Sequence, residues 1–191
     1  MAPRLYSIGH GARTFEGFVA VLAEAGVTQI ADVRAYPGSR RHPHFGRAEL
    51  ERTLPAAGVA YAWLPALGGM RKANGGGGAA AAAARHPGLK EEAFRAYADH
   101  TDSAEFAGGL ARLLALAAER QAAFMCAERE PGECHRSILA DKLWSVGVEV
   151  VHLVGLGEAR VHQPPPTLRI EARVGGTHHL RYDVGTQALL F

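Results

Sequence analysis

The reactive side chains of this sequence are concentrated in one stretch, FMCAEREPGECHRSILADKL, at residues 124–143. It holds both cysteines of the chain, Cys126 and Cys134, together with Glu128 and His135. A thiol beside an imidazole can act as a nucleophile, and a carboxylate at a strand end can transfer protons. We therefore expect catalytic chemistry at this corner. The plainer alternatives are an inert core thiol at Cys126 and a structural ion pair at Glu128.

A helix is expected to begin near His135, directly after the Pro-Gly turn of this stretch. Free backbone N–H groups and the helix dipole favour an anion at such a helix start. Arg136 and Ser137 add side-chain donors there, and a cysteine at this place, Cys134, is expected to have a lowered pKa. The sequence thus predicts anion binding beside a reactive thiol.

Further ionisable residues follow two strands expected earlier in the chain. His10 lies between two glycines, and Asp32 and Arg34 alternate with Val33, so their side chains share one face of a strand. Ser39 and Arg40 open a basic loop, SRRHPHFGR, that could contact phosphate. Asp32 and His10 are candidate catalytic groups and the arginines candidate anion ligands. The alternative for Asp32 is an internal salt bridge.

Strands and helices are expected to alternate about five times along the chain. Apolar runs predict strands at 4–10, 27–37, 59–67 and 121–128 and in EVVHLVGL, with amphipathic helices between them. The helical segment before the strand at 121–128 is expected to break near Asp102-Ser103. This alternation predicts an α/β fold, an open, mostly parallel Rossmann-like sheet flanked by helices on both faces. Because ligands bind at the carboxyl ends of such strands, the residues named above should converge on one rim.

Two segments differ from this alternation. Residues 75–84, GGGGAAAAAA, are low in complexity and read as an expanded loop with a short helical turn. After three prolines, Gly175-Gly176 separates two alternating runs, which is typical of a β-hairpin. We therefore divide the chain into an α/β domain at 1–157 and a C-terminal extension at 158–191, a β-hairpin appendage.

Composition limits the class of protein to which this chain can belong. The chain has 191 residues, 48% hydrophobic and 21% charged, which is typical of a soluble globular protein. We find no apolar run long enough for a bilayer and no signal peptide, so we expect a cytoplasmic protein without a membrane partner. Its two cysteines are then expected to be free thiols, or catalytic or metal-binding groups, rather than a structural disulfide. A net charge of +2 does not by itself indicate a nucleic-acid-binding surface.

Several familiar motifs do not fit. There is no GxGxxG fingerprint and no Walker loop. Thiol phosphatases need about five residues between cysteine and arginine, whereas nine separate Cys126 from Arg136 and one separates Cys134 from it. A zinc site normally takes four ligands, for which Cys126, Cys134, His135 and His10 are candidates, but no CxxC pair is present. We predict no cofactor, and a metal remains an alternative.

The motifs YSIGHG, IADVRAYPGSRRHPHF, LPALGG, FRAYADH and MCAEREPGECHRSILADKL together resemble the domain-of-unknown-function 488 (DUF488) family, in that order, over about residues 5–153. This chain departs from it at Gly11, where many members carry Ser or Thr, and in the Gly/Ala stretch. The resemblance implies no known reaction. The positions that it implies as candidates are His10, Asp32, Arg34, Pro37, Ser39, Arg40, Gly68, Gly69, Tyr97, Cys126, Glu128, Cys134, His135 and Arg136.

These observations predict a hydrolase or transferase, with a nucleotide-like or nucleic-acid-derived small anion as substrate. Arginines would bind the anion, Asp32 or Glu128 would act as general base, His10 or His135 as proton donor, and either cysteine as nucleophile. One alternative is a non-catalytic nucleic-acid-binding module, in which the arginines contact phosphates. A second is a metal-dependent enzyme that uses the cysteine and histidine residues. The sequence does not decide the oligomeric state.

Overall fold

The structure, a computed structural model, describes residues 4–38, 41–70, 78–172 and 178–184. Its strands are β1 (Arg4–Gly9), β2 (Gln29–Asp32), β3 (Ala60–Trp63), β4 (Ala122–Cys126), β5 (Glu149–Gly155), β6 (Glu158–Val161), β7 (Leu168–Ala172) and β8 (His178–Tyr182). Its α-helices are α1 (Phe15–Glu24), α2 (Arg47–Ala56), α3 (Gly78–Arg85), α4 (Glu92–His100), α5 (Ala104–Glu119) and α6 (Arg136–Ser145). Short 3-10 turns lie at Pro43–Phe45, Pro65–Leu67 and Pro131–Glu133.

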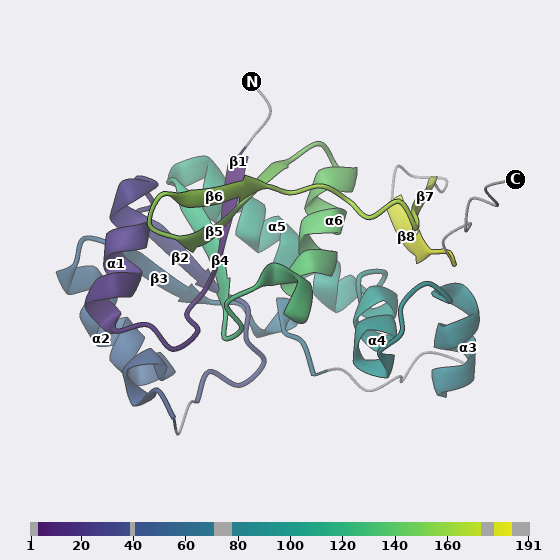
Figure 1. The fold of residues 1–191 in the computed structure, drawn as a ribbon, viewed down its shortest axis with the longest axis horizontal. Coiled ribbons are helices and arrows are strands. Elements are labelled where there is room, and N and C mark those ends of the chain that lie inside the picture. Colours follow the sequence, from purple (N-terminus) through teal and green to yellow (C-terminus); the bar gives the residue numbers. More distant parts are fainter. Residues whose placement is uncertain (1–3, 39–40, 71–77, 173–177, 185–191) are drawn as a thin grey trace, which may run out of the picture.

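A six-stranded sheet in the order β3-β2-β4-β1-β5-β6 forms the centre of the molecule (Figure 1). The first five of these strands are parallel, and β6 pairs antiparallel with β5. This confirms the open, mostly parallel α/β sheet. Two predicted strands are shorter than expected: β2 ends at Asp32 rather than at Pro37, and β3 ends at Trp63, just before the 3-10 turn Pro65–Leu67.

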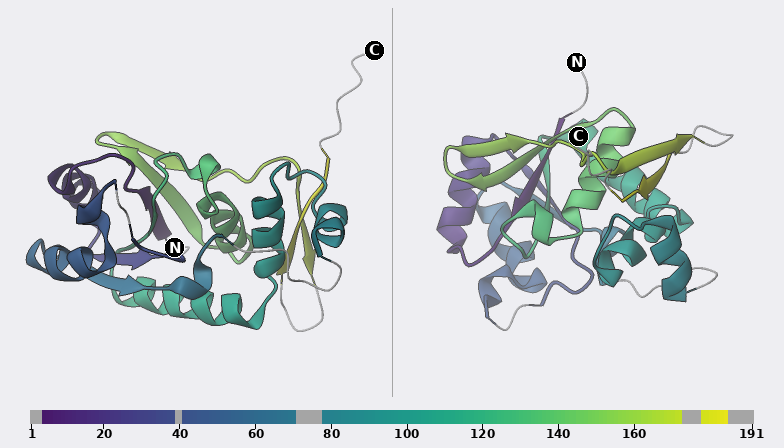
Figure 2. Two further views of the ribbon diagram at one scale, coloured as in Figure 1. Left: turned by 90° about the horizontal axis from the view of Figure 1, so that it is seen from below. Right: turned by 45° about the vertical axis from the view of Figure 1, so that its right-hand side comes forward.

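Helices cover both faces of the sheet, and alternate residues of each strand supply the two cores. Ile30, Ala123 and Met125 pack with α1 and α2 in one buried cluster. Their neighbours Ala31, Ala122 and Phe124 pack with α4, α5 and α6 in the other. Figure 2 shows α5 lying along its face of the sheet. The two-sided burial explains why these strands read as continuous apolar runs rather than as alternating ones.

Local signals in the sequence account for several helix boundaries. Thr14 caps α1 by accepting a hydrogen bond from the Gly17 backbone, 3.1 Å away. Ser103 caps α5 in the same way, which confirms the expected break between α4 and α5. None of the described helices is long and apolar enough to cross a bilayer.

The C-terminal segment holds the predicted hairpin. β7 and β8 pair antiparallel in a separate two-stranded sheet, while the turn at Gly175-Gly176 lies outside the described residues. The first part of the proposed extension, β6, instead joins the main sheet. The division at residue 157 stays a prediction. Of the Gly/Ala stretch, residues 78–85 form α3, and the residues before it lie outside the described part.

Candidate active site

The site is built where the chain changes direction across the sheet. β1 and β4 are neighbours, but α1 carries the chain from β1 towards β2 on one face, and α6 carries it from β4 towards β5 on the other. Such a switch point leaves a crevice beyond the carboxyl ends of the two strands. His10 and Cys126 leave β1 and β4 here, and the His10 backbone N–H donates to the Cys126 carbonyl over 3.0 Å.

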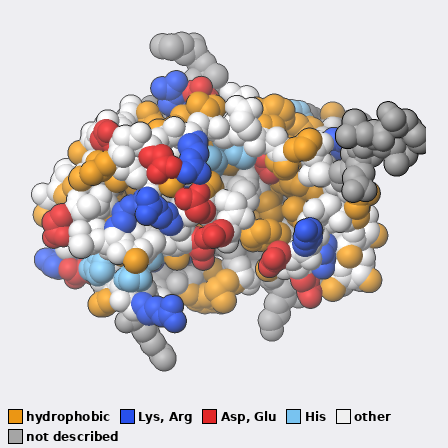
Figure 3. Space-filling view, in the orientation of Figure 1, with side chains coloured by type: hydrophobic (Ala, Val, Ile, Leu, Met, Phe, Trp, Pro, Cys, Tyr) orange, Lys and Arg blue, Asp and Glu red, His pale blue; other side chains and the backbone are white. Residues whose placement is uncertain are grey.

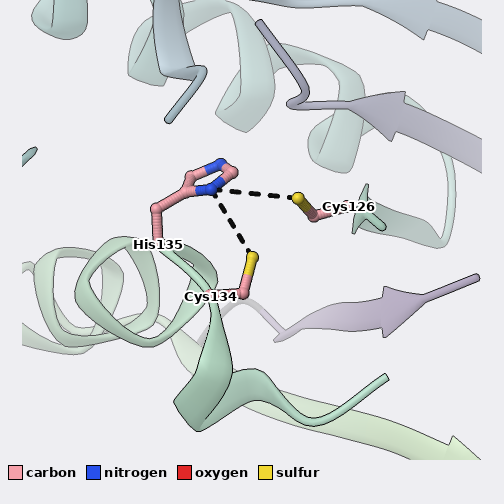
Figure 4. Close-up of side chains that lie close together, drawn as sticks. All are labelled: Cys126, Cys134 and His135. Atoms are coloured by element: carbon pink, nitrogen blue, oxygen red, sulfur yellow. Dashed lines mark hydrogen bonds between the residues drawn. The ribbon is translucent and has the colours of Figure 1, made fainter. Parts of the chain in front are cut away.

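Three side chains meet at this crevice, and we call them the Cys–His cluster: Cys126, Cys134 and His135. The Nδ1 atom of His135 lies 3.5 Å from the Cys134 sulfur and 3.8 Å from the Cys126 sulfur. Figure 4 shows both sulfurs pointing at the same ring nitrogen, one from the end of β4 and one from the turn before α6. All three residues are buried, and the three ligand atoms lie within 4.8 Å of one another.

Contacts on the far side of the imidazole fix its orientation. His135 Nε2 lies 3.0 Å from the Val33 carbonyl, so this nitrogen carries a proton and Nδ1 faces the two sulfurs. The Tyr97 ring packs 4.8 Å from the imidazole, and its hydroxyl donates to the Leu67 carbonyl. A Cβ at Gly69 would lie 2.7 Å from Nδ1, which explains a glycine at this position.

The two thiols of the Cys–His cluster have opposite proton affinities. A hydrogen bond from the Cys126 thiol, with further support from His135 and Arg136, holds the pKa of Cys134 far below its ordinary value despite burial. The same hydrogen bond, together with burial and the nearby Glu128 carboxylate, raises the pKa of Cys126. The lowered pKa expected for the thiol beside the helix start is therefore present at Cys134. The Cys126 sulfur also lies 3.1 Å from a Glu128 oxygen, so the two acceptors compete for the single thiol hydrogen.

A second group of side chains holds the Arg34 guanidinium beside the cluster. Asp32 accepts from Arg34 Nε at 2.8 Å and from Nη2 at 2.6 Å, and Tyr61 donates its hydroxyl to the same carboxylate at 2.7 Å. His10 Nδ1 faces the Gly11 carbonyl, so its other nitrogen accepts from Arg34 Nη1 at 3.4 Å. Asp32 is fully buried. Its contacts with Arg34 form the internal salt bridge that was the alternative prediction for this residue.

Two cavities open at the carboxyl ends of the strands. The first, which we call the thiol cavity, has a volume of about 300 Å³ and is lined by the Cys–His cluster together with Glu128, Tyr97, Phe94 and Met70. The second, the basic cavity, has a volume of about 450 Å³ and is lined by Arg34, Arg41, Arg129, His10 and His42. Four residues line both: Arg34, Tyr36, Ala127 and Glu128.

The surface around the crevice is uneven in character. In the space-filling view, basic side chains and histidines gather on the left half of the face shown, beside a group of acidic ones, whereas the right half is largely hydrophobic (Figure 3). Tyr36 and Met70, at the cavity edge, are 78% and 81% exposed. Met70 also has a positive φ of 59°, which is uncommon for a residue with a side chain.

Arg136 lies beneath the site rather than in the lining of either cavity. Its guanidinium donates to the Ser7 hydroxyl and to the carbonyls of Glu128 and Arg129, and the residue is 1% exposed. Ser137 donates to the Cys134 carbonyl at 3.0 Å. These contacts hold the turn between β4 and α6, and the anion-binding role predicted for both residues stays a prediction.

The other predicted site residues are distributed as follows. Cys126, Cys134 and His135 line the thiol cavity, His10 lines the basic cavity, and Arg34 and Glu128 line both. Asp32 lies behind Arg34, and Ser39 and Arg40 fall outside the described residues. The four candidate metal ligands separate, because His10 bonds to Arg34 while the other three form the Cys–His cluster.

Two arginines of the basic cavity were not among the individually predicted site residues, although Arg41 belongs to the loop SRRHPHFGR that was expected to contact phosphate. Arg41 follows the predicted Ser39-Arg40 pair, and Arg129 lies between the two cysteines. The double arginine RRHPHF was a usable signal for the first. Arg129 is separated from Arg41 by 88 positions, and only the neighbouring ends of β1, β2 and β4 bring the two to one cavity.

The Cys–His cluster is suited to two kinds of chemistry. A thiolate at Cys134 beside the imidazole of His135 matches an activated nucleophile. Two sulfurs and one ring nitrogen that converge on one point also match a set of metal ligands. In both cases a group bound in the basic cavity would lie next to the reacting centre.

Comparison with known proteins gives the chain a family. No curated protein and no solved structure matches it. One family model, described as Domain of unknown function DUF488, matches residues 14–143, a segment that runs from the cap of α1 to α6 and includes the Cys–His cluster and Arg34. The chain therefore belongs to the DUF488 family.

Proposed function

We propose that this protein is an enzyme, a hydrolase or transferase that acts on a small anionic substrate at the carboxyl edge of its sheet. The observation that carries the proposal is the common wall of the two cavities. A molecule whose anionic part occupies the basic cavity would extend past Arg34 and Glu128 to the Cys–His cluster. A binding cavity that adjoins paired reactive groups is the arrangement expected of an active site.

The basic cavity supports the choice of an anion. Arg34, Arg41 and Arg129 line it together with two histidines, against a single carboxylate at Glu128. Among the described contacts, Arg34 uses Nε and one hydrogen on each Nη, which leaves two N–H donors for a ligand. Guanidinium groups bind phosphate and carboxylate with paired hydrogen bonds.

The rim supports a nucleotide-like substrate as the first class to test. Tyr36 borders both cavities and is largely exposed, and Phe94 lines the thiol cavity. Aromatic rings at the edge of a phosphate-binding cavity can stack a planar base. Glu128, with its carboxylate beside Cys126, is positioned to transfer a proton, whereas Asp32 is occupied by Arg34 and Tyr61.

The test is a panel of phosphate, sulfate, nucleoside monophosphates and cyclic or diphosphate nucleotides, measured for binding by calorimetry and for turnover by product analysis. Arg41→Ala and Arg129→Ala should each weaken binding of the panel's ligands about tenfold, since one charged contact is worth roughly 1.4 kcal/mol. Arg112→Ala, an exposed change of equal charge on α5 outside both cavities, is the control.

Equal affinity in all three variants would exclude the basic cavity as the anion site. Binding without any turnover, together with tight oligonucleotide binding that falls steeply with salt, would instead favour the alternative of a nucleic-acid-binding module.

A further inference from the structure

We infer that the Cys–His cluster is a three-ligand site for a zinc-class divalent cation, held by the sulfurs of Cys126 and Cys134 and by Nδ1 of His135, with its fourth position open to the thiol cavity. The inference goes beyond the proposed function and stands on geometry alone.

The spacing of the ligand atoms fits one tetrahedral ion. Zinc–sulfur bonds of about 2.3 Å and zinc–nitrogen bonds of about 2.0 Å place a sulfur and a nitrogen about 3.5 Å apart in a tetrahedron. The observed separations from His135 Nδ1 are 3.5 Å to Cys134 and 3.8 Å to Cys126. An ion could therefore enter with small shifts of the side chains.

The surroundings of His135 are those of a metal ligand. A histidine that binds a metal nearly always donates its other ring N–H to a carbonyl or carboxylate, which fixes the tautomer. Here Nε2 faces the Val33 carbonyl at 3.0 Å, and Nδ1 faces both sulfurs, where its lone pair would be available to an ion (Figure 4). The glycine at position 69 leaves the space beside Nδ1 clear of a side chain.

The chemical types of the three ligand atoms indicate which cation would bind. Two thiolates and an imidazole are soft or borderline donors, which favour zinc over magnesium or calcium. Two thiolates also balance the charge of a divalent ion in a buried place. Without an ion one of these thiols keeps its proton, so binding should release protons to the solvent.

The open side of the cluster indicates a catalytic rather than a structural site. Structural zinc sites use four protein ligands, whereas catalytic ones use three and leave a position for water or substrate. All three ligands line the thiol cavity, and Glu128 lines it beside them. A bound water here would have a lowered pKa, with Glu128 close enough to accept its proton. This last step rests on the proposed function, and metal binding does not.

The experiment begins with untagged full-length protein purified without chelators, whose metal content is measured by mass spectrometry. We expect close to one zinc per chain. Reduced protein stripped of metal should rebind one Zn²⁺ in competition with a chromogenic chelator. Cobalt in place of zinc should give the thiolate charge-transfer band and the intense visible bands of a tetrahedral site.

Variants assign the ligands. Cys126→Ser, Cys134→Ser and His135→Gln should each weaken zinc binding more than 100-fold, since loss of a residue that only hydrogen-bonds to a ligand already costs about 10–100-fold. His44→Gln changes a histidine of the 3-10 turn Pro43–Phe45, near Arg13 and outside the thiol cavity, and should bind zinc like the parent. Circular dichroism shows which variants are folded.

The inference fails if reduced, folded parent protein takes up no zinc or cobalt, or if Cys126→Ser and His135→Gln retain parental affinity. It also fails if zinc binds without protecting the two thiols from an alkylating reagent. Anion binding is measured on the same metal-free protein, so the two results are independent. Failure to bind zinc would leave the proposed anion-binding function standing, and failure to bind anions would leave the metal site standing.

Discussion

Gly69 lies where a side chain would collide with the ring of His135. A Cβ there would be 2.7 Å from Nδ1 and 3.1 Å from Cγ of that ring, and the ring is held from behind by Val33 and Tyr97. Gly69→Ala should therefore displace the imidazole, lower the free energy of unfolding by about 1–3 kcal/mol and weaken metal binding at least about tenfold. Urea unfolding and zinc competition measure the two effects.

Gly108→Ala is the matched control for this change. Gly108 lies within α5, and nothing lies within 4 Å of an added Cβ. Alanine is the better helix former, so the free energy of unfolding should stay equal or rise by up to about 1 kcal/mol. If Gly69→Ala behaves like this control, the collision with His135 does not restrict the site.

The Asp32–Arg34 pair should matter more to stability than an ion pair on the surface. Asp32 is fully buried and holds both Arg34 and Tyr61, so Asp32→Asn leaves a buried guanidinium without its counter-charge. We expect a loss of about 3–5 kcal/mol in urea unfolding. Glu49→Gln, which removes the exposed pair with Arg52, should change stability by no more than about 0.5 kcal/mol. Equal losses of stability in the two variants would show that the buried Asp32–Arg34 pair contributes no more than a surface ion pair.

Individual residues differ in how far the sequence could predict them. The strand period placed Asp32 and Arg34 on one face. The pKa of Cys134 is lowered as expected, but by the Cys126 thiol, His135 and Arg136 rather than by the helix start that the sequence suggested. Period and spacing cannot show what lies opposite a side chain. The convergence of Cys126 on His135, the burial of Arg136 and the position of Arg129 in the basic cavity depend on packing between distant elements.

The start of α6 is tied to the sheet by Arg136. Its guanidinium joins Ser7 on β1 to the carbonyls of Glu128 and Arg129 in the loop after β4. Arg136→Met keeps the length of the side chain and removes these bonds, so we expect a loss of about 2–4 kcal/mol and faster hydrogen exchange in residues 127–134. Ser137→Ala, which removes one hydrogen bond of the same turn, should cost about 1 kcal/mol. Loss of phosphate binding in Arg136→Met, with stability intact, would support the anion-binding role instead.

The elements were easier to predict than their order. Apolar runs and the Asp102-Ser103 break located most strands and helices, because capping and burial on both sheet faces are local in the sequence. The insertion of β4 between β2 and β1 has no local signal, and neither does the antiparallel pairing of β6 with β5. That insertion places Cys126 at the switch point, so the exact site followed from topology that the sequence did not reveal.

A buried polar chain connects the hairpin to the sheet. The Tyr182 hydroxyl of β8 donates to Asp141 of α6 at 2.6 Å, Asp141 faces His162 at 2.9 Å, and His162 faces His152 of β5 at 3.0 Å. Burial raises the pKa of Tyr182 and, together with the neighbouring His162, lowers that of His152 to about 3. The hairpin and the main sheet should therefore unfold together, and both should respond to acid.

Acid should destabilise the whole molecule before its carboxylates titrate. Burial lowers the pKa of His10 to about 4 and that of His152 to about 3, against about 6.5 in an unfolded chain. The unfolded state then binds more protons, so stability is full above pH 6.5 and falls as the pH drops towards 4, by at most about 1.4 kcal/mol per pH unit for each histidine. Urea unfolding at pH 7, 6 and 5 measures the slope of the unfolding free energy against pH. His10→Gln should reduce this slope by the contribution of up to one bound proton. A slope that is unchanged in this variant would mean that His10 is protonated in the folded protein, and that its contact with Arg34 cannot be the acceptor bond inferred from the geometry.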